Sequence, residues 1–298
     1  MPNSYQTKNY LDLKAIIILL ILCTLWGGNM AAIKFSNKGL APMFTAGLRS
    51  LVAAGLMYLW LRYRGERIFP PGLRKIHAVM VGVLFGLEFA FIYISQHYTL
   101  ASRSYIFLYT HPFWVAWGAH YLIPGDQLTR RRFLGLLLAF GGLVFAFSEG
   151  LTRFSGSVLW GDFLVLLGAL GWAATTLYVK LFLVRSCGAF QTLIYQLIFS
   201  APVLFVLSFL LEGNPIRYVD WTIGISFFYQ AVIVAWLSYW AWFYLMHIYP
   251  VTSLAAFSFI TPISGVFISS LLLQEPLSLT LLVSLVLISL GIYWVNKR

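Results

Sequence analysis

The feature that most constrains the fold is a series of long apolar stretches, each about the length needed to cross a bilayer. A spanning helix needs about 20 mainly apolar residues, and Pro, Gly and charged residues divide the 298-residue chain into ten such stretches. The expected limits are 15–35, 42–61, 77–96, 100–122, 133–149, 158–182, 189–211, 221–246, 251–273 and 277–295. The sequence therefore predicts an all-α polytopic membrane protein with ten transmembrane helices and no separate soluble domain.

Composition supports this prediction. The chain is 60% hydrophobic and 10% charged, whereas a soluble domain carries about a quarter charged residues. The two cysteines, Cys23 and Cys187, imply no disulfide bond. The first apolar stretch resembles the core of a signal peptide, but it continues through Ile33, which is too long for such a core, so we interpret it as the first helix.

The distribution of Lys and Arg predicts the orientation. With a cytoplasmic N-terminus, the inner segments hold 14 of the 20 basic residues, the outer segments hold 5, and Arg49 lies within the second stretch. This bias places both termini in the cytoplasm. We therefore attribute the net charge of +11, including the run Arg130 to Arg132, to the orientation of the chain in the membrane. The expected partner is the lipid bilayer, and nucleic acid is not expected.

The two halves of the chain repeat one pattern. At an offset of 146, Trp26 and Lys34 fall on Trp172 and Lys180, and at 150, Pro112 falls on Pro262. At an offset of 149, Asp126, Leu128 and Gly142 fall on Glu275, Leu277 and Gly291. We interpret residues 1–150 and 151–298 as two five-helix units. Because five is odd, the second unit enters the membrane with the opposite orientation, and inverted repeats are typical of alternating-access transporters.

These residues carry a family resemblance. The chain is similar to the EamA domains of the drug/metabolite transporter superfamily over nearly its whole length, through the segments TLWGGNMAAIK, YIFLYTHPFWVAWGAHYLIPGDQLTRRRFLGLLLAFGGLVF and FSFITPISGVFISSLLLQEPLSLTLLVSLVLISLGIYW. The resemblance implies a ten-helix inner-membrane exporter of amino acids or other small metabolites with a central cavity. Two departures leave the substrate open: Gln127 and Pro276 differ at one repeat position, and no Asn in the second half matches Asn29.

Two charged side chains fall deep inside predicted spans, where charges are costly and usually face a bundle interior or a water-filled cavity. Glu88 has no other Lys, Arg, Asp or Glu within ten residues on either side. It is either a paired structural carboxylate or a group that binds a substrate amine or a proton. Arg49 either extends to the outer headgroups or binds a substrate or partner. We favour the functional interpretation for both.

Arg49 and Glu88 are also predicted to share a depth. At about 1.5 Å per residue, both lie roughly 10 to 12 Å below the outer edge of their helices. We therefore expect both to face the central cavity, close enough to pair directly or through water. A substrate carboxylate would replace Glu88 at Arg49, while the substrate amine or a proton engages Glu88, which makes Glu88 the candidate for proton coupling.

Aromatic and amide side chains complete the predicted cavity. Five aromatic residues from Tyr105 to Tyr121 recur every four positions in the fourth stretch, and helical spacing would align them on one side. Such a stripe is usually packing or a lipid-facing belt, but a cavity wall is the alternative, because some members lie away from the interfaces where belts occur. Together with Arg49 and Glu88, the cavity candidates are Trp26, Asn29, Tyr109, Trp172, Gln230, Trp236 and Trp240.

Two prolines are candidate hinges. Pro112 lies within the fourth stretch and Pro262 at the matching position of the ninth. A proline inside a helix removes one backbone hydrogen bond and usually kinks the helix. We expect both positions to mark bends, with the two helices approaching each other near the cavity.

The function predicted from these features is secondary transport. We expect export of amino acids or related small metabolites by alternating access, with protonic coupling as an option. One alternative is efflux of hydrophobic cations or drugs, which the aromatics and Glu88 favour and Arg49 opposes. The other is a membrane-embedded acyltransferase-like enzyme, for which His120 with Asp126 is the weak candidate pair. Because motifs for ATP binding and for zinc or serine chemistry are missing, we expect no enzyme activity, no cofactor and no metal. A homodimer stays open.

Overall fold

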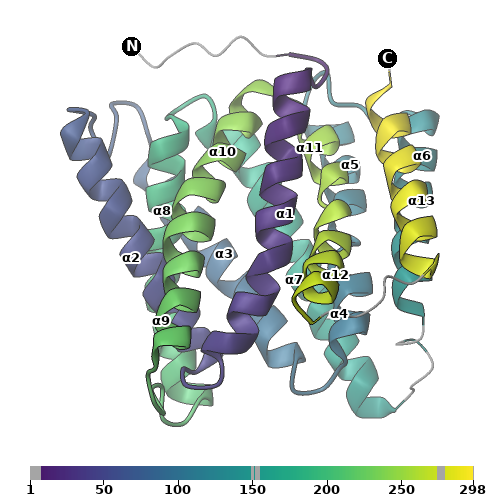
Figure 1. The fold of residues 1–298 in the computed structure, drawn as a ribbon. Coiled ribbons are helices and arrows are strands. Elements are labelled where there is room, and N and C mark those ends of the chain that lie inside the picture. Colours follow the sequence, from purple (N-terminus) through teal and green to yellow (C-terminus); the bar gives the residue numbers. More distant parts are fainter. Residues whose placement is uncertain (1–7, 149–150, 152–154, 274–278, 298) are drawn as a thin grey trace. The chain divides into compact units, whose positions relative to one another are not determined.

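The computed structural model describes residues 8–148, 151, 155–273 and 279–297, and these are helical apart from short connections and one β-bridge between Leu40 and Ile216 (Figure 1). Six continuous helices match predicted stretches within a few residues. They are α1 (Leu13–Ser36), α2 (Pro42–Tyr63), α3 (Lys75–Ser95), α6 (Arg130–Phe147), α8 (Ala189–Leu211) and α13 (Leu279–Asn296). The predicted start of the last stretch, residue 277, and the predicted repeat boundary at residue 150 lie outside the described residues.

The other predicted stretches contain two or three consecutive helical segments. The fourth consists of α4 (Ala101–Leu108) and α5 (His111–Leu122), and the ninth of α11 (Val251–Phe257) and α12 (Ile260–Leu273). Two others continue into wider, π-helical turns. They are α7 (Gly156–Tyr178) with η2 (Val179–Leu183), and α9 (Trp221–Phe228) with η3 (Tyr229–Ser238) and α10 (Tyr239–Ile248). Such π-helical turns are frequent at functional sites.

Within the described residues, eight helical stretches are long and apolar enough to cross a membrane. Many of their large apolar side chains are exposed, including Leu59, Phe209 and Val286. Exposed apolar surface on this scale is what a lipid environment would cover, because contiguous patches of this kind are rare on soluble monomers. The chain is therefore a polytopic, all-α membrane protein.

The chain forms two compact units that do not follow the two halves of the sequence. The first contains residues 29–90 and 178–248, and the second contains residues 8–28, 91–177 and 249–297. Each unit thus combines helices from both halves.

In the first unit, α2 packs along α8 (Figure 1). At each end of this helix pair, a glutamate carboxylate accepts hydrogen bonds from the other helix. Glu212, just after α8, accepts hydrogen bonds from the Met43 and Phe44 main-chain N–H groups at the start of α2, at 2.7 and 3.0 Å. Glu66, just after α2, accepts from the Gln191 side chain in the first turn of α8, at 3.1 Å. Glu66 and Glu212 are 146 residues apart, so the two contacts are reciprocal.

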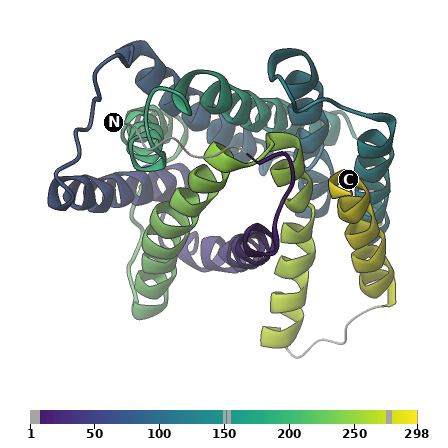
Figure 2. The same cartoon turned by 90° about the horizontal axis from the view of Figure 1, so that it is seen from above.

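In the second unit, α6 and α13 run side by side (Figures 1 and 2), with glycines where the backbones approach. A Cβ added to Gly135 would lie 2.7 Å from the Gly291 carbonyl oxygen, and one added to Gly142 would lie 3.0 Å from the Ser284 carbonyl oxygen. At the offset of 149, Gly135 matches Ser284 and Gly142 matches Gly291. These contacts are also reciprocal, as across a two-fold axis, and the partner positions run antiparallel.

Candidate functional site

The first unit brings Arg49 and Glu88 into one buried environment. Arg49, in the second turn of α2, is 1% exposed, and Glu88, in α3, is 5% exposed. Arg49 lies within electrostatic range of Glu88, yet the two make no direct ion pair within the described part of the chain. All three guanidinium nitrogens of Arg49 and one carboxylate oxygen of Glu88 are buried without a hydrogen-bond partner.

Aromatic rings lie beside these two charged groups. The Arg49 guanidinium carbon lies 4.7 Å from the centroid of the Phe89 ring, a distance at which the ring face attracts a cation. Tyr239, at the start of α10, interacts electrostatically with both charged groups, and its ring lies 6.0 Å from that of Phe85. Sequence reasoning missed Phe85, Phe89 and Tyr239, although Phe89 and Tyr239 are 150 residues apart, an offset of the repeat.

The amide candidates of the first unit have different surroundings. Gln230 is buried in η3, and its amide donates to the Ser36 hydroxyl at 2.9 Å, which is a structural link between η3 and α1. Asn29 is also buried, and its side-chain oxygen has no hydrogen-bond partner in the described chain. A buried polar atom without a partner is costly, so Asn29 stays a candidate for ligand contact.

The two tryptophans predicted near Gln230 are half-buried. Trp240 stacks on Phe190, at the start of α8, with ring centroids 5.3 Å apart, and Phe190 also contacts Trp60 near the end of α2. The ring of Trp240 therefore belongs to an aromatic packing cluster between α2, α8 and α10. Trp236 lies in η3.

The second unit holds the remaining aromatic candidates, and two of them, Tyr109 and Trp172, lie at the interruption between α4 and α5. Tyr109 is 2% exposed at this interruption and lies 6.0 Å, ring to ring, from Trp172 of α7. Trp172 stacks on His111 at 3.7 Å, and the His111 Nε2 lies 3.2 Å from the Ser258 hydroxyl. Trp26 of α1 is half-buried.

The aromatic stripe predicted along the fourth stretch is wrong as a continuous face. The helix is interrupted between Leu108 and His111, so the spacing of four residues does not hold across this gap. Tyr109 is buried, whereas Trp117 and Tyr121 are 55% and 73% exposed. Spacing alone could not find this, because the rule of four assumes an unbroken helix.

Both candidate hinge prolines follow helix interruptions. Pro112 occupies the first turn of α5, and Pro262 the first turn of α12. A proline there has no intrahelical hydrogen bond to lose, so the preceding residues leave the helix instead. The two interruptions lie close together in the second unit, since the Tyr109 and Phe259 rings are 6.5 Å apart. Whether either proline acts as a hinge stays a prediction.

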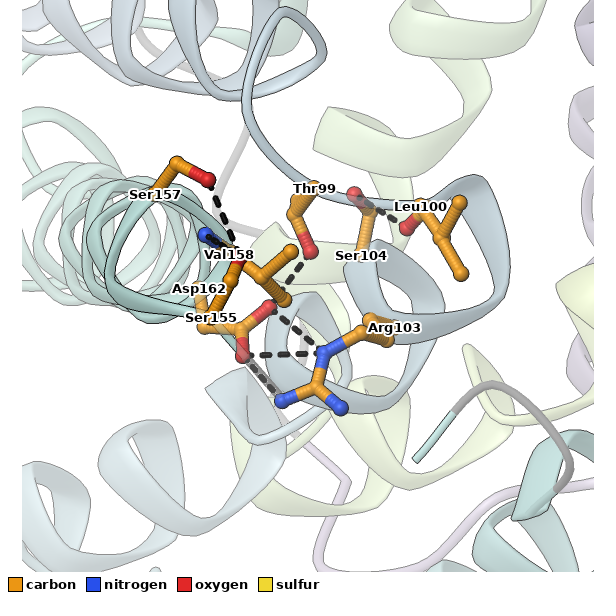
Figure 3. A network of polar contacts seen from close by, with 8 residues as sticks. All are labelled: Thr99, Leu100, Arg103, Ser104, Ser155, Ser157, Val158 and Asp162. Atoms are coloured by element: carbon orange, nitrogen blue, oxygen red, sulfur yellow. Dashed lines mark hydrogen bonds and ion pairs between the residues drawn. The ribbon is translucent and has the colours of Figure 1, made fainter. Parts of the chain in front are cut away.

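A buried ion pair fastens α4 to α7 in the second unit. Figure 3 shows the Asp162 carboxylate facing the Arg103 guanidinium and the Thr99 hydroxyl. Arg103 Nε lies 3.0 Å from one oxygen, Arg103 Nη2 binds the same oxygen, and Thr99 donates to the other at 2.6 Å. Arg103 and Asp162 are 2% and 3% exposed. The sequence analysis did not predict this pair.

His120 and Asp126, the weak candidates for acyl transfer, do not form a pair. Asp126 accepts from Arg132 and from the Thr252 main-chain N–H, both at 3.0 Å, and it thereby caps α11. His120 Nδ1 accepts from the Leu128 main-chain N–H at 3.3 Å. In the part of the chain that the structure describes, no group of three or more His, Cys, Asp or Glu side chains could hold a metal ion.

The fold and the buried charges define a helical membrane protein with polar groups held inside its bundles. The model of the EamA-like transporter family matches residues 13–148 and 159–297. The chain therefore belongs to the EamA-like transporter family of the drug/metabolite transporter superfamily, and its general role is that of a transporter.

Known relatives match nearly the whole chain. An "Uncharacterized transporter" of Archaeoglobus fulgidus is 27% identical, covering 96% of this chain and 98% of its own length. A "Probable amino-acid metabolite efflux pump" of Escherichia coli is 24% identical, covering 93% of each chain. A solved crystal structure shares the fold with a TM-score of 0.80 at 15% identity, covering 95% of this chain and 96% of that chain.

Proposed function

We propose that this transporter exports amino acids or related small metabolites across a bacterial-type inner membrane. The observation that carries the proposal is Arg49, whose guanidinium is almost wholly buried and makes no hydrogen bond within the described chain. A buried guanidinium without partners is strongly disfavoured, and its planar fork matches a carboxylate in bidentate geometry. A substrate carboxylate is the ligand that best satisfies Arg49.

Glu88 supplies the complementary charge for the same ligand. It lies within electrostatic range of Arg49 and has one unpartnered oxygen, so it is placed to accept a substrate amine or a proton. One buried cation and one buried anion together suit a zwitterion with no net charge. The relatives named as amino-acid metabolite efflux pumps support the same substrate class.

The mechanism proposed is alternating access by two inverted five-helix repeats with ten spans. Counting α4 with α5 as one kinked span, and α6 as another, brings the eight apolar stretches to ten. The reciprocal contacts of α2 with α8 and of α6 with α13 support inverted repeats. A two-fold axis perpendicular to the helices, lying in the membrane plane, would produce antiparallel reciprocal contacts of this kind.

The rival within the transporter class is efflux of hydrophobic cations. It is favoured by the aromatic rings of Phe85, Phe89 and Tyr239 near Glu88, because ring faces attract organic cations. Arg49 opposes it, since a buried cation repels another at short range in a medium of low dielectric constant.

Competition against transport into proteoliposomes tests the proposal. The wild-type protein, reconstituted at full length, is given a panel of radiolabelled amino acids, and each transported one is challenged with its carboxamide and its N-acetyl derivative. We expect the free amino acid to compete at least about tenfold better than either derivative, because each lost charged hydrogen bond costs about 1.5 to 3 kcal/mol.

Variants at Arg49 locate the carboxylate contact. Arg49→Gln should abolish the discrimination against the carboxamide while leaving that against the N-acetyl derivative. Arg217→Gln, which alters an exposed loop residue, is the matched control and should transport as wild type does. Equal competition by acid and carboxamide in the wild type, or transport of organic cations but no amino acid, would overturn the proposal.

A further inference from the structure

A buried imidazole lies in the second unit, at the first residue of α5. His111 is 1% exposed, and the transport mechanism proposed for Arg49 and Glu88 does not use it. Its Nε2 atom lies 3.2 Å from the hydroxyl of Ser258, the residue that follows α11. Since α5 packs against α11 (Figure 1), this contact joins the interruption between α4 and α5 to the one between α11 and α12.

The hydrogen bonds of Ser258 determine where the neutral ring carries its hydrogen. The Ser258 hydroxyl has a single proton, which it donates to the Ala255 main-chain oxygen at 2.6 Å. The hydroxyl oxygen must therefore accept from His111, so Nε2 carries a hydrogen and Nδ1 holds a lone pair. Within the described chain, Nδ1 is buried and has no hydrogen-bond partner.

A second proton, on Nδ1, would be costly in this arrangement. The Leu108 main-chain carbonyl, which lacks its helical donor because of Pro112, interacts with the ring, but Nδ1 forms no hydrogen bond. A buried charge without a hydrogen bond or an opposite charge is strongly disfavoured. The stacked face of Trp172 offsets only part of this cost. The structure therefore represents the neutral state of His111.

No charged side chain in the described part of the chain compensates for such a proton. The titratable groups on this side are the hydroxyl of Tyr109, whose ring lies 5.8 Å from the imidazole, that of Tyr105 one turn earlier in α4, and the Cys23 thiol of α1 close to Tyr109. All three are ordinarily neutral at pH 7. The described parts of α7, α11 and α12 present no titratable side chain to the ring.

The repeat indicates that packing at this position does not require an imidazole. At the offset of 150, His111 matches Thr261, and Ser258 matches Leu108. The equivalent pair of residues thus has no group that titrates. Only one of the two matching positions can bind a proton.

We propose that His111 is a proton-binding site that controls the arrangement of the two interruptions. A group that binds a proton weakly in one arrangement and more strongly in another shifts the equilibrium between them as the pH falls. Proton uptake favours an arrangement in which Nδ1 reaches water or the Leu108 carbonyl, and loss of the proton restores the buried contact with Ser258. The proposal rests on the alternating access proposed above, which supplies the second arrangement.

The native thiol of Cys23 reports on this change. It is buried in α1 and donates to the main-chain oxygen of Phe257, the last residue of α11, at 3.2 Å. In a Cys187→Ser background, its reaction with 2,2′-dithiodipyridine, which still modifies thiols in mild acid, is timed at about pH 5.5 and about pH 7.5. We expect the rate with His111 intact, divided by the rate in His111→Gln at the same pH, to be about one at the higher pH and at least about ten at the lower.

The matched control is His97→Gln, which removes an exposed imidazole from the same unit. At both pH values, Cys23 in this variant should react as it does with both histidines intact. The proposal is overturned if the rate ratio for His111→Gln is the same at the two pH values, or if both variants lose the response equally.

A second readout needs no substitution at His111. Full-length protein is labelled with 5-fluorotryptophan, and the fluorine resonance of Trp172, assigned with Trp172→Phe, is followed from about pH 7.5 to about pH 5. We expect it to change, because Trp172 stacks on His111; a resonance independent of pH refutes the proposal even if His111→Gln does not fold. Neither readout uses a substrate or a pH gradient, so a failure of amino-acid transport, or of coupling at Glu88, is distinguishable from a failure here.

Discussion

Arg49 and Glu88 show what single residues reveal in a sequence of this kind. The depth of both residues below the ends of their helices was predicted from the rise per residue of an α-helix. The structure places both side chains in the interior of one unit. Their aromatic neighbours could not be predicted, because Tyr239 reaches them from a helix 151 residues beyond Glu88. Hydropathy identifies a charge that is out of place, but contacts between distant segments determine what surrounds it.

Replacing Glu88 by Gln tests proton coupling. The amide keeps the size of the side chain but cannot exchange a proton. In proteoliposomes, we expect wild-type transport to vary with an imposed pH gradient, and Glu88→Gln to transport at a rate independent of that gradient while remaining folded by size-exclusion chromatography. An unchanged pH profile in the variant would reject this role.

The Arg103–Asp162 pair should be essential for stability. Removing one partner of a buried ion pair costs about 3 to 5 kcal/mol, because the other charge stays buried and unpaired. We expect Asp162→Asn to lower the midpoint of thermal unfolding in detergent markedly. The double variant Arg103→Met/Asp162→Leu removes both charges and should recover part of the loss; a double variant less stable than Asp162→Asn would contradict this explanation.

Cys187 should be unreactive. It lies in the connection between η2 and α8 and is 4% exposed, and burial raises the pKa of its thiol to about 11. Because the thiolate is the nucleophile, alkylation by N-ethylmaleimide at pH 8 should be at least about 100-fold slower than in the unfolded chain, and should accelerate as the pH approaches 11.

The control for this experiment is a thiol at a neighbouring exposed position. Arg185→Cys in a Cys187→Ser background places it two residues away on the surface, and it should react at the rate of a free thiol. If Cys187 in the folded protein reacts as fast as this control, then its burial in solution differs from that in the structure.

At the scale of elements, helix limits were predictable and helix interruptions were only partly so. The apolar stretches gave most ends within a few residues, because the length of a span is set by the bilayer. Pro112 and Pro262 indicated where two helices would be disturbed, but not that the chain would leave the helix before each proline. The π-helical turns of η2 and η3 have no such sequence signal.

The contact between α6 and α13 depends on glycine. A Cβ at position 142 would lie 2.9 Å from the Leu287 side chain and 3.0 Å from the Ser284 carbonyl oxygen, whereas one at position 141 would meet nothing within 4 Å. We expect Gly142→Ala to destabilise the protein by about 1 to 3 kcal/mol through overpacking, measured by thermal unfolding.

Gly141→Ala is the matched control on the next position of the same helix. It should be neutral or stabilising by up to about 1 kcal/mol, because Ala favours the helix over Gly. Equal destabilisation by both variants would show that helix propensity rather than close packing determines the effect.

At the scale of the whole molecule, the distribution of Lys and Arg predicts which connections face the cytoplasm. The packing into two compact units does not test this prediction. With ten spans, the connection after α2 and the C-terminus face the cytoplasm, and the connection after α8 faces outward. Alkaline phosphatase fused after Gly72 or at the C-terminus should therefore be inactive, and fused after Asn214 it should be active. An active C-terminal fusion would indicate an odd number of spans.

The reciprocal helix pairs have a consequence for how the protein is made. The main-chain N–H of Met43 and its partner Glu212 are 169 residues apart, and Gln191 and Glu66 are 125 residues apart. At about 5 to 20 residues per second, a ribosome needs roughly 6 to 34 s to supply the second member of each contact. During that time the packing surfaces of the first half lie uncovered in the bilayer, where proteases and chaperones can reach them. The second half then covers these surfaces, as a partner subunit would.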